Sequence, residues 1–161
     1  MVWLSLLNKS DEAIKAYNKA IEINPQDSMA WDYKGDLLEG LGKDDEALKA
    51  FDKAIEINPQ DSMAWTGKGM TRNDLNKYEE ALKAYDKAIE INSWNSDAWT
   101  NKGVVLANLN KSDEAIKTYD KAIEINPQNS NAWNNKGAVL VKLGHSDEAI
   151  AAFDKAIGTN P

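Results

Sequence analysis

The chain contains no cysteine among its 161 residues and only one histidine, His145. The lack of cysteine excludes disulfides, thiolate metal ligands and a thiol nucleophile. It also permits a reducing compartment, and we expect a cytoplasmic protein. No glycine-rich phosphate loop, metal-ligand cluster or nucleophile motif is present, and His145 occupies a turn position that elsewhere holds lysine. We therefore predict a protein that is not an enzyme and that uses no cofactor and no metal.

Basic residues are in the minority, since 19 Lys and Arg oppose 26 Asp and Glu and give a net charge of −7. This balance argues against nucleic acid and anionic membrane surfaces as partners. Long apolar runs are also missing, because none approaches the roughly 20 residues of a transmembrane helix. The opening MVWLSLL has no basic flank, and Leu7–Ala13 recurs as Leu109–Ala115, so we interpret the start as part of a repeat.

A repeat of 34 residues dominates what the sequence does contain. INPQDSMAW occupies Ile23–Trp31 and again Ile57–Trp65, and INPQNSNAW occupies Ile125–Trp133. The copy at Ile91–Trp99 reads INSWNSDAW, with Ser93 and Trp94 in place of Pro-Gln. Two sets of residues recur in phase: Trp31, Trp65, Trp99 and Trp133, and Gly35, Gly69, Gly103 and Gly137. Self-similarity at this period is typical of a solenoid.

Each unit divides into two amphipathic helices. Trp31, Gly35, Leu38 and Leu41 share one side of a first helix about 14 residues long. Residues that tolerate a left-handed conformation are expected to end the first helices: Asn8, Gly42, Asn76, Asn110 and Gly144. A second helix then buries Ala47, Phe51, Ala54 and Ile55, and we expect Gly35 to pack against Ala47. Asn58-Pro59 ends this helix, and the next first helix is capped by Asp61, with Asp27, Asn95 and Asn129 at the matching positions.

In this pattern the sequence resembles the tetratricopeptide repeat family. The matching residues of one unit are Trp31, Gly35, Leu38, Ala47, Phe51, Ala54 and Pro59. The resemblance implies an all-α fold in which antiparallel helix pairs stack into a right-handed superhelical solenoid with a concave groove. We expect one solenoid domain, divided into a truncated repeat at 1–27 (the stump of a first helix plus a second helix) and repeats at 28–61, 62–95, 96–129 and 130–161.

The family resemblance implies that first-helix side chains line the groove. The residues that the 34-residue shift places on this face are Met29, Asp32, Asp36, Glu39, Met63, Thr66, Met70, Asn73, Thr100, Asn101, Val104, Asn134, Asn135 and Ala138. The face is acidic at one end and becomes neutral and rich in asparagine. Trp94 is a candidate contact at the groove rim, with local packing and neutral drift as alternatives. Lys34, Lys68, Lys102 and Lys136 also recur in phase, and we expect their stems to cover apolar surface rather than to form an anion site.

Two functions follow from these patterns. The first is a protein-binding module whose groove accepts a peptide or a partner helix, basic or amphipathic in character. The second is a structural role, in which incomplete ends carrying Val2, Trp3 and Leu4 at one side and Ile150, Phe153 and Ile157 at the other associate head to tail.

Overall fold

The computed structural model describes residues 2–158, which form nine helices and no strand. In chain order these are α1 (Val2–Ile23), α2 (Ser28–Gly40), α3 (Asp44–Ile57), α4 (Ser62–Asp74), α5 (Tyr78–Ile91), α6 (Ser96–Asn108), α7 (Ser112–Ile125), α8 (Ser130–Lys142) and α9 (Ser146–Gly158). The predicted all-α fold is confirmed. The pairs α2–α3, α4–α5, α6–α7 and α8–α9 are the repeating helical hairpins.

Side-chain caps begin the first helices at the predicted positions. Asp27 accepts a hydrogen bond from the backbone N–H of Ala30, and Asp61 accepts from Met63 and Ala64. Asn95 and Asn129 accept in the same way from the third residue after them. These caps satisfy amide groups that have no partner inside the helix.

The first helices end at residues with a left-handed backbone. Gly42, Asn76, Asn110 and Gly144 have φ of 69°, 57°, 59° and 81°. This conformation lets the following amide turn back toward the helix, and the N–H of Lys43 donates to the carbonyl of Leu38 at 2.8 Å. A short turn therefore reverses the chain direction inside every hairpin.

Each hairpin is closed by an aromatic ring of the second helix that packs on a glycine of the first. Phe51 has no exposed surface, and Tyr85 and Tyr119 are 1% exposed. A Cβ atom built on Gly35 would lie 2.6 Å from Cε1 of Phe51, and one on Gly103 would lie 2.5 Å from Cε1 of Tyr119. The atoms nearest to Gly35 thus belong to the ring of Phe51, which is far larger than the methyl group of Ala47, the expected neighbour.

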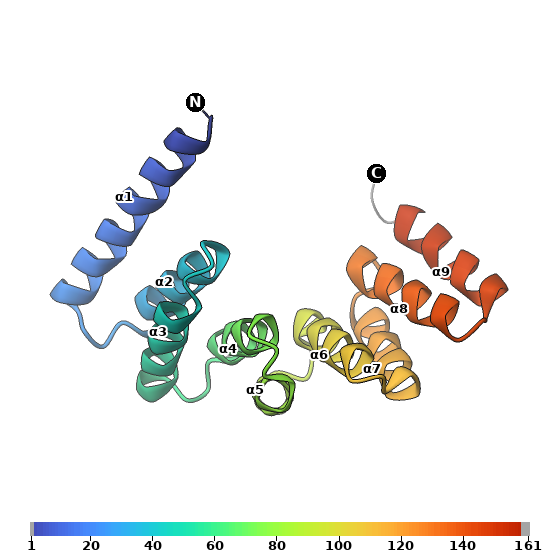
Figure 1. The fold of residues 1–161 in the computed structure, drawn as a ribbon. Helices are drawn as coiled ribbons and strands as arrows, with labels where there is room; N and C mark the ends of the chain where they lie inside the picture. The colour runs from blue at the N-terminus through green and yellow to red at the C-terminus, as the bar shows by residue number, and fades with distance from the viewer. Residues whose placement is uncertain (1, 159–161) are drawn as a thin grey trace.

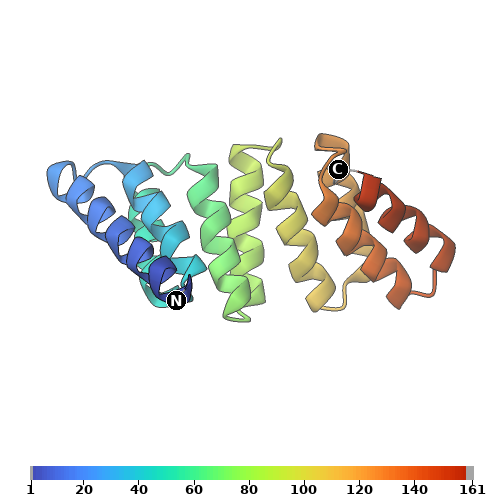
Figure 2. The same ribbon diagram turned by 90° about the horizontal axis from the view of Figure 1, so that it is seen from above.

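Stacking of the hairpins produces a curved array. The neighbouring first helices contact one another, α2 with α4, α4 with α6 and α6 with α8, whereas no two second helices in the described residues do. Because first helices are closer together than second helices, the array curves with the first helices on its inner side. The hairpins follow an arc from α1 to α9 (Figure 1), and from above their helices lie side by side along the molecule (Figure 2).

The predicted break at Asn8 is wrong, because α1 runs without interruption from Val2 to Ile23. A six-residue stump buries too little surface to stabilise a hairpin. Continuing the helix instead adds one backbone hydrogen bond for each residue. For Val2, Trp3 and Leu4, which we expected at an incomplete end, the structure describes the helical backbone but not the side chains.

The joint between α5 and α6, which has Ser93 and Trp94 in place of Pro-Gln, keeps the hydrogen bond that the other joints make. The indole Nε1 of Trp31 donates to the carbonyl of Pro25, and Trp65 and Trp133 donate to Pro59 and Pro127. Trp99 makes the equivalent bond to Ser93 at 3.0 Å. Since a backbone carbonyl accepts the bond, the loss of proline at this joint leaves it intact.

Candidate functional site: the concave surface

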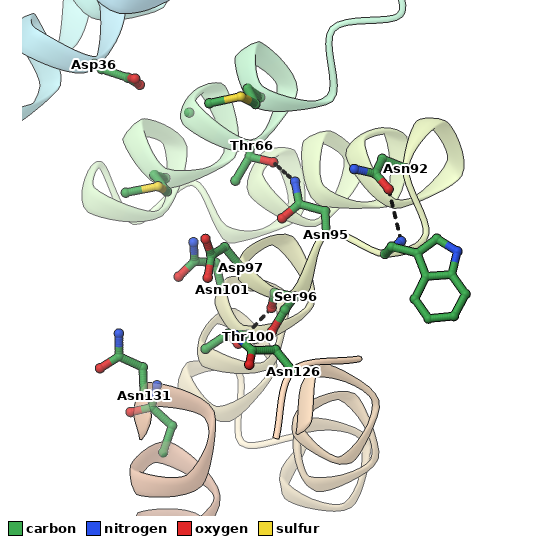
Figure 3. A pocket seen from close by; sticks show the side chains of 15 residues that line it. Asp36, Thr66, Asn92, Asn95, Ser96, Asp97, Thr100, Asn101, Asn126 and Asn131 are labelled. Carbon is green, nitrogen blue, oxygen red and sulfur yellow. Dashed lines mark hydrogen bonds between the residues drawn. The ribbon is translucent and has the colours of Figure 1, made fainter. Parts of the chain in front are cut away.

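A cavity of about 750 Å³, which we call the main cavity, lies on the inner side of the arc. Figure 3 shows that its lining side chains come from α2, α4, α6 and α8 and from the joints between hairpins. The lining residues are Asp36, Met63, Thr66, Gly67, Met70, Asn92, Trp94, Asn95, Ser96, Asp97, Thr100, Asn101, Asn126, Asn131 and Asn135. Amide side chains dominate this set, and each offers both donors and an acceptor.

Two smaller cavities adjoin the main cavity. We call the surface formed by all three the concave groove. One of about 140 Å³ is lined by Glu39, Met70, Asn73 and Val104 with their neighbours. Another of about 240 Å³ contains Val104, Asn135 and Ala138. Together the three cavities bring eleven of the fourteen predicted residues to one continuous inner surface: Asp36, Glu39, Met63, Thr66, Met70, Asn73, Thr100, Asn101, Val104, Asn135 and Ala138.

The other three predicted residues line none of these cavities. Met29 and Asn134 are exposed. Asp32 is only 3% exposed, on a helix that packs against α1, α3 and α4. Asp36, one turn later on the same helix, is exposed.

Polar ladders between neighbouring hairpins hold the groove wall in place. The Nδ2 atom of Asn95 donates to Ser62 Oγ at 3.1 Å and to Thr66 Oγ1 at 3.2 Å. Asn129 repeats the arrangement with Ser96 at 2.8 Å and Thr100 at 3.1 Å. The asparagine that caps one first helix thus also binds the preceding one. Thr66 and Thr100 are buried by these contacts, and they stabilise the wall in addition to lining it.

The ladder is replaced by carboxylates at the joint between α2 and α4. Asp61 stands where the other two joints have asparagine, and Asp32 stands where they have threonine. A carboxylate supplies no donor, and Oδ1 of Asp32 is buried without a hydrogen-bond partner. Burial, together with the charges of Asp36 and Asp61, raises the pKa of Asp32 to about 7.

Acidic side chains concentrate at the α2 end of the groove. Partial desolvation and the charge of Asp61 raise the pKa of Asp36. Partial burial raises the pKa of Glu39, and the charge of Asp74 and a hydrogen bond with it raise this pKa further. The positive charge of a ligand would relieve this crowding of carboxylates.

Trp94 is the most exposed aromatic residue of the groove. Its side chain is 77% exposed, although it lines the main cavity. Its backbone N–H donates to Asn92 Oδ1 at 3.1 Å, which orders the turn that carries it. An exposed indole held by an ordered turn offers apolar contact area at little entropic cost.

The phased lysines lie away from the groove, between hairpins. Lys68, Lys102 and Lys136 pair with Asp52, Asp86 and Asp120 of the preceding second helices at 2.7, 2.6 and 2.5 Å. All four lysines, Lys34 included, also lie over the tryptophan three residues before them. Contacts with aspartate and tryptophan side chains therefore explain why lysine recurs at this position of each repeat.

Family models described as tetratricopeptide repeat match the sequence at residues 7–62, 62–95, 96–129 and 118–151. The chain belongs to the tetratricopeptide repeat family. No protein with curated annotation matches it significantly.

Several solved structures superpose over nearly the whole chain. A crystal structure of MamA has 25% identity and a TM-score of 0.81, and the match covers 96% of this chain and 91% of that one. MamA from Desulfovibrio magneticus RS-1 has 19% identity and a TM-score of 0.80, with 98% and 90% covered. TTC0263, a tetratricopeptide repeat protein of Thermus thermophilus, has 22% identity and a TM-score of 0.84, with 99% and 88% covered.

Sequence reasoning missed the groove residues that belong to the joints. Asn92 and Asn126 end second helices, and Asn95 and Ser96 begin a first helix. Their recurrence in the INPQ-type segments indicates turn and cap chemistry, but it gives no sign of their exposure to the groove. In the part of the chain that the structure describes, no group of three or more His, Cys, Asp or Glu residues could hold a metal ion, and no helix is both long and apolar enough to cross a bilayer.

Proposed function

We propose that the protein is a non-enzymatic binding module whose concave groove holds an extended peptide or a partner helix. The observation that carries this proposal is the cavity of about 750 Å³, built by first helices of successive repeats and lined by amide side chains. Asparagine amides donate to and accept from a peptide backbone whatever its sequence. Met63 and Met70, 59% and 37% exposed, add adaptable apolar contacts.

The charge of the groove indicates the polarity of the ligand. Asp36 and Glu39 lie toward one end, whereas Asn101, Asn135 and Ala138 lie toward the other. A segment with basic residues near one end and uncharged residues in the remainder complements this gradient. Trp94 would contact the ligand at the rim.

Selection from a random peptide library, followed by synthesis of the selected peptides, tests the proposal. We expect the triple variant Met70→Ala, Asn101→Ala, Asn135→Ala to weaken binding at least about tenfold, since all three residues line the main cavity. The control is Lys53→Ala with Lys87→Ala, two exposed second-helix residues, which should leave affinity unchanged. Binding that ignores the groove variant, with circular dichroism unaltered, would contradict the groove assignment.

Self-association is a second candidate, favoured by the apolar surface of α9. Ile150 and Ile157 are 59% and 72% exposed, whereas Leu48, which corresponds to Ile150 in an inner hairpin, is 7% exposed. The next hairpin covers this face in the inner units, and a second copy of the chain would cover it on α9.

Sedimentation over a concentration series tests self-association. We expect the mean mass to rise with concentration for the parent protein and to stay monomeric for Ile150→Lys with Ile157→Lys, because two buried charges would oppose the contact. A parent protein that is monomeric at all concentrations would rule the second candidate out.

A further inference from the structure

The joint between α2 and α4 contains a buried acceptor with no donor. Asp32 is 3% exposed, and its Oδ1 atom has no hydrogen-bond partner. Leaving a buried polar atom unpaired costs about 1–3 kcal/mol, and more for a charged group. Such atoms are few in native structures, and each one calls for an explanation, such as a functional role or a bound partner.

The α4–α6 and α6–α8 joints contain a side-chain donor that the α2–α4 joint lacks. There, Thr66 and Thr100 receive hydrogen bonds from the Nδ2 atoms of Asn95 and Asn129. At the α2–α4 joint the donor position is held by Asp61, whose carboxylate already accepts from the amides of Met63 and Ala64. Nothing in the joint replaces the lost Nδ2 donor.

A third carboxylate connects this joint to the groove. Asp36 follows Asp32 by four residues, so both lie on one side of α2. Asp36 is exposed and lines the main cavity together with Met63. Lys34 of the same helix does not serve the carboxylates, because its ammonium lies 5.1 Å from the ring centre of Trp31.

We propose that Asp32, Asp36 and Asp61 form a subsite that binds an arginine side chain of the groove ligand. A guanidinium carries five N–H donors in a planar fork, which suits carboxylates approaching from two helices better than the three donors of an ammonium. The exposed Met63 borders the cavity there and would pack against the methylene stem. This subsite deepens the proposed function, since it states which residue type the acidic end of the groove recognises.

Ligand binding at this subsite is coupled to proton release. The charged groups that face Asp32 are Asp36 on its own helix and Asp61 before α4, and burial with these charges raises its pKa to about 7. A guanidinium favours the ionised form of Asp32. Affinity for arginine should therefore increase as the pH rises through neutrality.

Titration with single amino-acid derivatives tests the subsite without knowledge of the natural ligand. The probe is N-acetyl-arginine methylamide, followed by amide chemical shifts in ¹⁵N-labelled protein. We expect saturable shifts at Asp36, Asp61 and Met63, affinity that is higher at pH 8 than at pH 6, and several-fold weaker binding of the lysine derivative. The citrulline derivative, which has the same shape without the charge, should give no saturable shift.

A double variant that copies the other joints provides the matched test. Asp32→Thr with Asp61→Asn restores the threonine–asparagine hydrogen bond and should weaken arginine binding at least about tenfold. Asp113→Asn with Asp147→Asn removes the same net charge from exposed second-helix positions and should leave affinity unchanged within about twofold. Equal affinity in parent and Asp32→Thr, Asp61→Asn protein, or equal binding of citrulline, would overturn the subsite.

The outcome is separable from that of the groove experiment. If arginine gives no saturable shift while selected peptides still depend on Met70, Asn101 and Asn135, the subsite fails and the groove function stands. If arginine binds as described while no peptide binds the groove, the subsite stands and the wider function fails.

Discussion

Replacing Gly35 with alanine is expected to destabilise the protein by about 1–3 kcal/mol, although alanine is the better helix former. The added Cβ would lie 2.6 Å from Cε1 of Phe51. The ring has no room to retreat, because it has no exposed surface and it also packs against Gly67. Relief of the clash therefore requires α2 and α3 to separate, and leucine at position 35 should be tolerated still less.

Gly40 offers a matched control in the same helix. A Cβ built there meets no atom within 4 Å, and its backbone is not left-handed. Gly40→Ala should therefore stabilise the protein by about 0.4–1 kcal/mol through the lower entropy of the unfolded chain. Urea unfolding of both variants measures the difference. Equal effects of the two substitutions would show that the Phe51 contact does not constrain the hairpin.

The variant Asp32→Thr with Asp61→Asn should stabilise the protein at neutral pH and reduce its sensitivity to pH. A threonine at position 32 would form the hydrogen bonds that Thr66 and Thr100 make, to the carbonyl four residues earlier and to the asparagine of the next helix. The substitution also removes a carboxylate whose pKa the fold raises from 3.8 to about 7. That shift corresponds to a destabilisation of at most about 4 kcal/mol.

The direction of the pH effect follows from the raised pKa of Asp32. Below about pH 4, Asp32 is protonated in both the folded and the unfolded chain, and it adds no penalty. Between about pH 4 and 7 the unfolded chain releases the proton while the folded chain retains it, so the free energy of unfolding falls. Above about pH 7 the penalty is complete and constant. Acid should therefore strengthen the α2–α4 joint.

Unfolding free energies measured from pH 4 to pH 8 test this assignment. The parent protein should lose stability over the interval, and the double variant should lose less, with a residual slope from Asp36 and Glu39, whose pKa values are also raised. The converse change, Thr66→Asp with Asn95→Asp, should introduce the same pH dependence at the α4–α6 joint. Parallel curves for the parent and the first double variant would contradict the role given to Asp32.

The α2–α4 and α4–α6 joints show that a small change in sequence is enough to alter the chemistry of a repeat. Asp61 and Asn95 cap their helices equally well, because each offers one side-chain oxygen to the helix amides. They differ in the second group of the side chain, which is a donor in asparagine and an acceptor in aspartate. Capping alone thus does not distinguish them, whereas contact with the preceding helix does.

Most of the fold was predictable because the repeat displays the same local signals several times. Caps at Asp27, Asp61, Asn95 and Asn129, and helix ends at Gly42 and Asn76, depend on backbone chemistry within a few residues. Asn8 carries the same signal as Asn76, yet α1 continues through it. A helix stop thus needs a partner helix to pack against as well as a suitable residue.

By itself, the sequence determined the helix pairs, their caps and the inner face on which Asp36, Met70 and Asn101 lie, because these follow from periodicity and local hydrogen bonding. Only the tertiary structure decided which of those residues remain accessible. Asp32 and Asp36 lie one turn apart on the same side of α2, but Asp32 is 3% exposed, whereas Asp36 is exposed and lines the groove. Burial depends on how closely two hairpins approach, and that distance is set by the packing of Phe51 against Gly35 and Gly67, residues that lie far apart in the chain.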